Sequence, residues 1–362
     1  MTTETKRLDY VDIAKGLAML AIVWGHIMLV GWSHNFVYGF HIFIFFFLSG
    51  MMFRKEKYDS VISLLKKRYR TLLIPYFFLS VISWCIWAGY NYLLHNTVES
   101  YWMPLIETFI AQGSGGYLVH NVPLWFIPCL LFVEVVYYFV CKHTNSYANI
   151  LICILCAIVG YLMVLPNEFF DFTKLPWNIE AGLSALVFYC VGNLLISHIG
   201  HEKIMNWVNA NKFFSVTIVL VFTILLYFGT LYNGHVTLGT NVFGKNPFAF
   251  YITGICGTIS TIVFSLLMTF SNRQLVVKKM VTFVRWVGRN SLYFLAVHCP
   301  LKGFVVVFIA KFLHLENSRM VQENMTYSLV SFAVTMILSS VVVILILKWI
   351  RFYNKKFISR NA

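Results

Sequence analysis

Residues 11–32 read VDIAKGLAMLAIVWGHIMLVGW, an apolar run that is long enough to cross a lipid bilayer as a helix. Beyond Asp12 at its start, two ionisable side chains interrupt it, Lys15 and His26. A hydrocarbon environment penalises such groups, so they persist mainly where they line a cavity or serve a function. At about 100° per residue, their separation of 11 residues places them on one helix face, roughly 16 Å apart along the axis. The stretch therefore predicts a membrane helix with a polar stripe.

The composition of the whole chain indicates the same class of protein. Of its 362 residues, 59% are hydrophobic and 12% are charged, whereas a soluble domain averages about 25% charged residues. The aromatic share of 18% suits the aromatic belts at the two membrane interfaces. We therefore predict an all-α polytopic integral membrane protein in which residues 1–362 form a single transmembrane domain.

About ten apolar spans can be drawn, each near the ~20 residues that cross the hydrocarbon core. They cover residues 11–32, 36–53, 72–94, 123–141, 147–165, 182–198, 213–232, 248–270, 290–313 and 328–350.

The placement of lysine and arginine predicts the orientation, because cytoplasmic loops are enriched in both. With the N-terminus inside, the cytoplasmic segments hold 22 of the 28 basic residues and the outer segments hold 4. Both termini are then cytoplasmic, residues 54–71 form a basic cytoplasmic loop, and residues 95–122 form an extracytoplasmic loop. Since the basic residues are dispersed among loops, the net charge of +14 is a topology signal and does not indicate a nucleic-acid partner.

Two further polar residues belong to the stripe. His41 follows a predicted turn at residues 33–35, and His26 and His41 are nearly equidistant from it. An antiparallel hairpin would bring both imidazoles to about the same depth. Asp12 lies three residues before Lys15 and therefore on the same face. A polar stripe that ends in two imidazoles indicates a reaction site within the membrane.

Several short motifs resemble a known family. The run DIAKG at 12–16, followed by ten residues between Lys15 and His26, resembles the signature of the membrane acyltransferase-3 family, in which ten residues lie between a basic residue and a histidine. Further matching motifs are FHIFIFFFLSG (40–50), LIPY (73–76), LWF (124–126) and GRNSL (288–292). The 40–50 block resembles the fucose 4-O-acetylase-like branch. Many members have arginine at the position of Lys15. Lysine keeps the positive charge but lacks the planar guanidinium group of arginine. The fucose 4-O-acetylase-like branch often has lysine there.

The resemblance implies ten spans and an O-acyltransferase of the EC 2.3.1 type in a bacterial inner membrane. Such an enzyme moves an acyl group, usually acetyl from cytoplasmic acetyl-CoA, to a hydroxyl of a glycan or lipid-linked sugar. A sugar hydroxyl is a poor nucleophile and needs a base within hydrogen-bond reach. His26 is the natural base, because histidine titrates near neutrality. We expect direct transfer in a ternary complex; a covalent acyl-histidine relay is the alternative.

The residues around His26 each have more than one interpretation. His41 orients His26, holds the acceptor hydroxyl, or is structural. Asp12 and Lys15 pair with each other or bind the donor near the cytoplasmic mouth, and Lys15 has the further alternative of extending to the interface.

Candidates for the donor site all lie on the predicted cytoplasmic side: Ser49, Arg68, Arg70, Arg289, Asn290 and Ser291. Their hydroxyl and amide groups suit the oxyanion that develops on the thioester carbonyl. Their guanidinium groups suit the phosphates of coenzyme A.

Candidates for the acceptor site are Trp125, Glu134 and His298. Trp125 stacks on a sugar face or belongs to the interfacial belt. Glu134 lies in mid-span, where a carboxylate is costly unless it is neutral or paired. His298 binds substrate or donates to carbonyls that the nearby Pro300 frees. No HxxxH motif or acidic cluster occurs, so we expect no metal.

Two other classes of protein remain open. A polytopic exporter or transporter of a polysaccharide or lipid-linked glycan would also have ionisable residues in its spans, but the sequence has no inverted repeat and no matched pair of broken helices. A non-catalytic scaffold for polysaccharide synthesis would need no stripe from Lys15 to His26. The expected partners are acyl-CoA, the sugar acceptor and membrane lipid, and the sequence does not predict an oligomeric state.

Overall fold

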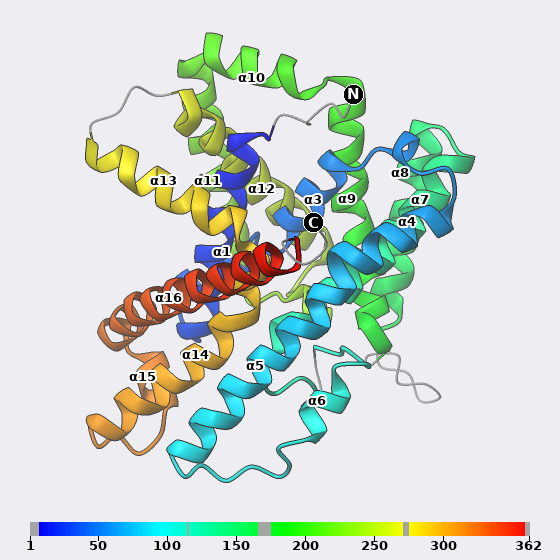
Figure 1. Cartoon of the computed structure of the whole chain (residues 1–362). Coiled ribbons are helices and arrows are strands. Elements are labelled where there is room, and N and C mark those ends of the chain that lie inside the picture. Colours follow the sequence, from blue (N-terminus) through cyan, green and yellow to red (C-terminus); the bar gives the residue numbers. More distant parts are fainter. Residues whose placement is uncertain (1–6, 114–115, 166–174, 271–274, 359–362) are drawn as a thin grey trace.

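The computed structural model describes residues 7–113, 116–165, 175–270 and 275–358 (Figure 1). Residues 114–115 of the predicted extracytoplasmic loop and both chain ends lie outside these ranges. Within them the chain is helical, and nine helical stretches are long and apolar enough to cross a membrane. A tenth apolar helix, Ser146–Leu162, is 17 residues long and coincides with the predicted span 147–165. The prediction of an all-α polytopic membrane protein is confirmed.

The helices are α1 (Asp9–Ile27), α2 (Trp32–Tyr38), α3 (Phe43–Met52), α4 (Val61–Arg68), α5 (Ile74–Leu93), α6 (Met103–Glu107), α7 (Phe126–His143), α8 (Ser146–Leu162), α9 (Ile179–His198), α10 (His201–Ala210), α11 (Lys212–Asn233), α12 (Pro247–Phe270), α13 (Leu275–Arg289), α14 (Ser291–Phe312), α15 (Arg319–Glu323) and α16 (Met325–Ile358). A π-helical turn, η2 (Tyr69–Leu73), joins α4 to α5, and a 3-10 turn, η3 (Val122–Trp125), precedes α7.

The first helix lies near the centre of the molecule (Figure 1) and packs against α2, α3, α12, α13, α14 and α16. Most of its side chains are buried, including Asp12. By contrast, α11 and α16 expose large apolar side chains such as Phe228 and Ile337. Extended apolar surface of this kind suits contact with lipid. The polar stripe on α1 is thus enclosed by protein.

Two glycines allow α1 and α13 to cross at backbone contact. A Cβ on Gly16 would lie 2.0 Å from the carbonyl oxygen of Val284, and a Cβ on Gly288 would lie 1.7 Å from that of Asp12. Any side chain at either place would force the two helices apart. The crossing brings Arg289, the last residue of α13, to within 2.9 Å of the Asp12 carboxylate.

The second predicted span, 36–53, consists of two helices. The chain leaves helical order after Tyr38 and resumes at Phe43. Gly39, between them, packs tightly against α11, because a Cβ there would lie 2.6 Å from the Cγ2 of Thr230. This break places His41 in a turn inside the bundle.

The turn that precedes α2 lies at residues 28–31 and includes Gly31 with φ of +86°. Residues 33–35, where the sequence predicted the turn, belong to α2. The prediction that His26 and His41 are equidistant from a turn is therefore wrong. The break after Tyr38 nevertheless brings both histidines to the same cavity.

Candidate active site

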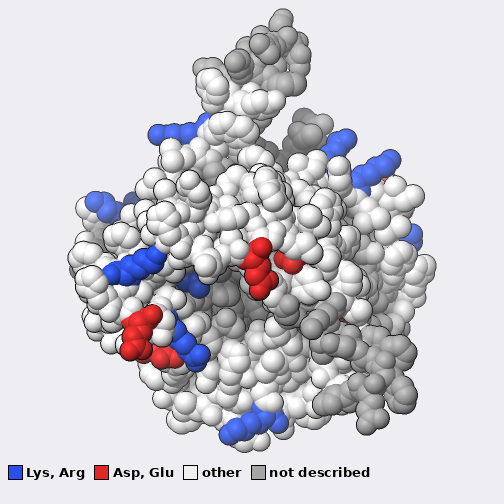
Figure 2. Space-filling model, turned by 90° about the horizontal axis from the view of Figure 1, so that it is seen from below, with Lys and Arg blue, Asp and Glu red and all other residues white. Residues whose placement is uncertain are grey.

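Two cavities lie inside the helical bundle, and we name them after the predicted orientation. The inner cavity has a volume of about 260 Å³ and is lined by Lys15 on α1 and by residues of α3, α7 and α14. The outer cavity has a volume of about 410 Å³ and is lined by His26, by loop residues 119–123 and 237–240, and by α14. At the end of the molecule where α6 and α15 lie in Figure 1, Figure 2 shows a hollowed surface with basic and acidic side chains beside the hollow.

Three apolar side chains line both cavities and separate them: Ile22, Ile42 and Leu295. We call these three residues the constriction. Each is at least nine-tenths buried. His26 follows Ile22 by one helical turn and therefore lies just beyond the constriction, on the outer side.

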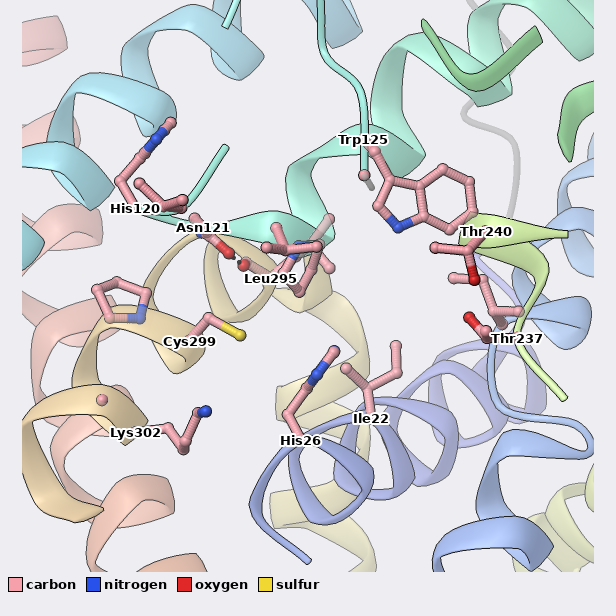
Figure 3. A pocket seen from close by; sticks show the side chains of 18 of the residues that line it. Ile22, His26, His120, Asn121, Trp125, Thr237, Thr240, Leu295, Cys299 and Lys302 are labelled. Atoms are coloured by element: carbon pink, nitrogen blue, oxygen red, sulfur yellow. Dashed lines mark hydrogen bonds between the residues drawn. The ribbon is translucent and has the colours of Figure 1, made fainter. Parts of the chain in front are cut away.

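His26 is surrounded by other aromatic and imidazole rings. Its ring centroid lies 5.5 Å from that of His298 on α14 and 6.4 Å from that of Tyr38. The Tyr38 ring also lies 4.7 Å from that of His41. Figure 3 shows His26 from α1 and Cys299 and Lys302 from α14 facing one space. The site therefore joins residues of α1 and α14 that lie far apart in the sequence.

The backbone fixes the tautomers of the neighbouring histidines. Nδ1 of His298 lies 2.9 Å from the carbonyl oxygen of Phe294, and Nδ1 of His41 lies 2.7 Å from that of Val37. A carbonyl oxygen only accepts, so each Nδ1 carries a proton and each Nε2 is left as an acceptor. The His26 ring has no hydrogen bond within the described residues. His26 can therefore exchange a proton at either nitrogen.

His298 donates to backbone carbonyls, but not to the carbonyl that Pro300 frees, so that alternative for His298 is wrong. Proline lacks an N–H, which frees the carbonyl four residues earlier, that of Ala296. Ser83 and Asn121 donate hydrogen bonds to that oxygen, with an Asn121 Nδ2 distance of 2.6 Å. His298 instead donates to Phe294 and to the next carbonyl. The Nε2 of His298 is buried, has no partner among the described residues, and remains available to a ligand or to His26.

Trp125 lies in the wall of the outer cavity. Its indole packs between Gly113 and Gly239, and the residue is 7% exposed. This burial favours a role inside the site over one in an interfacial belt. Trp87 and Tyr90 line the same cavity, so its wall has several aromatic faces.

Glu134 lines the inner cavity, not the outer one, and it is paired. Its carboxylate oxygens lie 2.6 and 2.7 Å from the Arg68 guanidinium. Lys15, Ser49 and Ser291 line the same cavity. Three of the six donor-site candidates, Ser49, Arg68 and Ser291, are thus brought together around Lys15.

The other donor-site candidates lie elsewhere. Arg70 is exposed on η2, and the Asn290 amide donates to the carbonyl of Trp286 at the junction of α13 and α14. Neither residue lines the inner cavity. Arg289 is held by two carboxylates, those of Asp9 and Asp12, each at 2.9 Å.

Asp12 pairs with arginines and not with Lys15. Its carboxylate lies 2.8 Å from Arg7 and 2.9 Å from Arg289, and no ion pair within 4.0 Å joins it to Lys15 in the described ranges. The side chain is 6% exposed. Asp12 therefore ties α1 to α13, while Lys15 faces the inner cavity.

Three potential metal ligands meet in the outer cavity. The ligand atoms of His26, His298 and Cys299 lie within 4.8 Å of one another. A structural zinc site needs a fourth ligand, and the ammonium of Lys302 on the same wall opposes a cation. The absence of a metal stays a prediction.

His120 lies in the wall of the outer cavity just before η3 and gives a prediction on acid stability. Its Nε2 lies 3.0 Å from the Ser80 hydroxyl, and burial lowers the pKa of His120 to about 4. The unfolded chain binds a proton there near pH 6.5. Between about pH 6.5 and pH 4 the unfolded state thus binds more protons, so folding stability falls as the pH falls, by about 2 kcal/mol at pH 5.

We expect His120→Gln to lose less thermal stability than the wild type when the pH changes from 7.5 to 5 in detergent. His95→Gln, at an exposed histidine of the same loop, is the control and should behave like the wild type. Equal losses in the wild type and His120→Gln would contradict the assignment.

Sequence reasoning missed several residues that line the outer cavity. Lys302 carried a usable signal, because it is an ionisable residue within an apolar span. Asn121 and His120 come from the loop before η3, where polar residues are ordinary. Tyr38 and Cys299 are residue types common in membrane helices, so no local pattern marks them.

The fold and these features define an integral membrane protein with a histidine-centred site inside the helical bundle. The Acyltransferase domain family matches residues 8–347. The chain belongs to this family and is a membrane acyltransferase, which confirms the resemblance to the acyltransferase-3 family; its place in the fucose 4-O-acetylase-like branch stays a prediction. None of the curated proteins and none of the solved structures matches the chain.

Proposed function

We propose that this acyltransferase moves a short acyl group, acetyl or succinyl, from cytoplasmic acyl-CoA to a hydroxyl of a glycan or lipid-linked sugar. The observation that carries the proposal is the meeting of two cavities at the constriction, with His26 one turn beyond Ile22. A donor entering one cavity and an acceptor entering the other would meet beside a single base. Family membership favours this transfer over the export of a glycan.

The inner cavity suits the narrow end of the donor. Ligand sites for whole drug-sized molecules occupy about 300–1,000 Å³, so about 260 Å³ accommodates the pantetheine arm and not the nucleotide. Lys15 and Arg68 supply positive charge near the thioester, and the hydroxyls of Ser49 and Ser291 supply donors for its oxyanion. The coenzyme A phosphates then stay at the cytoplasmic surface, where Arg70 is exposed.

His26 performs the proton transfers in this scheme. It accepts the proton of the acceptor hydroxyl while that oxygen attacks the thioester carbonyl carbon. The carbon–sulfur bond then breaks, and the imidazolium returns the proton to the sulfur of coenzyme A. The bare Nε2 of His298 orients the opposite edge of the His26 ring, and that of His41 accepts a hydrogen bond from the acceptor. Asp12 acts at a distance by fixing α1 against α13.

A test with sealed vesicles addresses both the reaction and its sidedness. The proposal places both termini and the donor site on the cytoplasmic side of a bacterial inner membrane. Labelled acetyl-CoA added outside inverted vesicles should label the glycan fraction. Right-side-out vesicles should incorporate label only after permeabilisation. Equal labelling of both sealed preparations would reject the proposed orientation, and no protein-dependent label in permeabilised vesicles would reject acetyl transfer.

Closing the constriction should stop transfer without removing a polar group. We expect Ile22→Trp to reduce acyl transfer by about 100-fold or more, because misplacement of reacting groups by about 1 Å already costs that much. Acetyl-CoA binding at the inner cavity should persist. Ile22→Val, which widens the same place, is the matched control, and both variants need a check of folding because overpacking costs about 1–3 kcal/mol. Full transfer by a folded Ile22→Trp protein would exclude a passage at this place.

A further inference from the structure

The outer cavity contains a cation without a protein counter-charge. Lys302 lies in the middle of α14, and its side chain faces the cavity near Cys299 and His26 (Figure 3). Within the described residues it has no ion pair and no hydrogen bond, and the cavity lining contains no carboxylate. An ammonium group within an apolar span is costly unless another group compensates its charge.

Several other cations beside the spans have protein partners. Arg68 contacts Glu134 at 2.6 Å, and Arg289 contacts Asp12 at 2.9 Å. Lys311, further along α14, donates to the carbonyl of Leu94. Lys15 in the inner cavity, like Lys302, has no ion pair within the described residues, and the proposed function assigns it to the acyl donor. The missing partner of Lys302 therefore points to an anion that arrives with the ligand.

The rest of the outer cavity suits a sugar. Trp87, Tyr90 and Trp125 offer aromatic faces. Tyr90 lies directly against α14, since a Cβ on Gly303 would lie 2.7 Å from its hydroxyl. The Oδ1 of Asn121 is a buried acceptor without a partner among the described residues, and it suits a sugar hydroxyl that donates.

We propose that the acceptor is an acidic sugar whose carboxylate or phosphoryl group binds Lys302 while the hydroxyl to be acylated lies at His26. This inference rests on the function proposed above and names its substrate class. Cys299 Sγ lies within 4.8 Å of one His26 ring nitrogen, and three residues of helix, about 4.5 Å, separate Cys299 from Lys302. The anion and the reacting hydroxyl therefore belong to the same sugar unit or to adjacent ones.

The test compares three soluble glycosides with the same ring: a neutral hexoside, the matching uronate and the matching hexoside phosphate. Binding to the full-length protein in detergent is measured by quenching of tryptophan fluorescence, since Trp87 and Trp125 line the cavity. Transfer is measured separately, by release of the coenzyme A thiol from acetyl-CoA. We expect the wild type to bind an anionic glycoside at least about tenfold more tightly than the neutral one, as one hydrogen bond to a charged group provides.

Matched variants assign this preference to one residue. Lys302→Gln should bind the three glycosides equally, and Lys302→Arg should keep the preference. Lys311→Gln removes the same charge from the same helix outside the cavity and should behave like the wild type. A preference for the uronate alone would identify an acidic glycan, and a preference for the phosphate alone would identify a sugar phosphate such as that of a lipid carrier.

The two assays separate this inference from the proposed function. Equal binding of all three glycosides by the wild type, or binding of none, overturns the inference. A Lys302→Gln variant with kcat lowered equally on all three also overturns it, because Lys302 would then act on the reaction itself. A charge preference that depends on Lys302 without any thiol release supports the acidic-ligand site and rejects the proposed transfer. Thiol release without a charge preference supports the proposed transfer and rejects the acidic-ligand site.

Discussion

Replacing His26 with alanine should lower acyl transfer by about 10²–10⁴-fold, the usual contribution of a general base. The expected loss is large because neither His41 nor His298 can replace it from the same position. His41 and His298 each commit Nδ1 to a backbone carbonyl, at 2.7 and 2.9 Å. His26 alone among these three has both ring nitrogens free within the described residues.

The measurement is transfer of labelled acetyl from acetyl-CoA into the glycan fraction of membranes that contain equal amounts of folded protein. His26→Gln tests whether a neutral hydrogen-bonding group suffices, and it should be as inactive as His26→Ala. His198→Ala, at an exposed histidine at the end of α9, is the control and should be fully active. Equal label from the wild type and His26→Ala would remove His26 from the chemistry.

The membrane helices were predictable because each depends on a local run of apolar residues. Nine of the ten predicted spans correspond to helical stretches of membrane-crossing length, and the tenth corresponds to the shorter α8. The break between α2 and α3 was not predictable. It depends on Gly39 approaching Thr230 of α11, almost 200 residues away, and the 36–53 segment alone is apolar throughout.

The polar stripe of α1 was predictable from helical periodicity, but its chemistry was not. Lys15 and His26 do face enclosed space, and the constriction divides that space so that each lines a different cavity. Of the two alternatives for Asp12 and Lys15, mutual pairing is wrong because Asp12 meets Arg289, 277 residues later, at the glycine crossing of α1 and α13. Tertiary packing over such separations leaves no trace in a single sequence.

The partner of His26 illustrates the same limit. His298 was a candidate from its position before Pro300, yet only the fold brings its ring to 5.5 Å from His26. Pro300 leaves the Ala296 carbonyl without its helical donor, and Asn121 provides one from outside the helix. Asn121, which belongs to no sequence motif, thus forms part of the outer-cavity wall that also contains His26.

Breaking the Arg68–Glu134 pair should lower the stability of the chain by about 3–5 kcal/mol, because it leaves a buried charge without compensation. Arg68 ends α4 where the chain enters the π turn η2, and Glu134 lies in mid-helix on α7. Their side chains are 23% and 3% exposed. Glu134 has one further contact, a Tyr189 hydroxyl at 3.4 Å, which cannot replace a guanidinium.

We expect Glu134→Leu and Arg68→Met each to lower the thermal unfolding temperature in detergent, whereas the double variant Arg68→Met/Glu134→Leu recovers most of the loss. Apolar replacement of both partners of a buried pair is often neutral or stabilising. Arg319→Met, which breaks the exposed pair with Glu323, is the control and should change stability by less than about 1 kcal/mol. Additive losses in the double variant would show that the two side chains do not act as a pair.

The double variant also separates the two roles that Arg68 can have. If Arg68 only compensates Glu134, the recovered protein should bind acetyl-CoA as tightly as the wild type. If its guanidinium also contacts the donor from the wall of the inner cavity, as we propose, the protein should be stable but should bind acetyl-CoA about tenfold or more weakly, the effect of one lost hydrogen bond to a charged group. A stable double variant with unchanged donor affinity would restrict Arg68 to structure and leave Lys15 as the cation of the inner cavity.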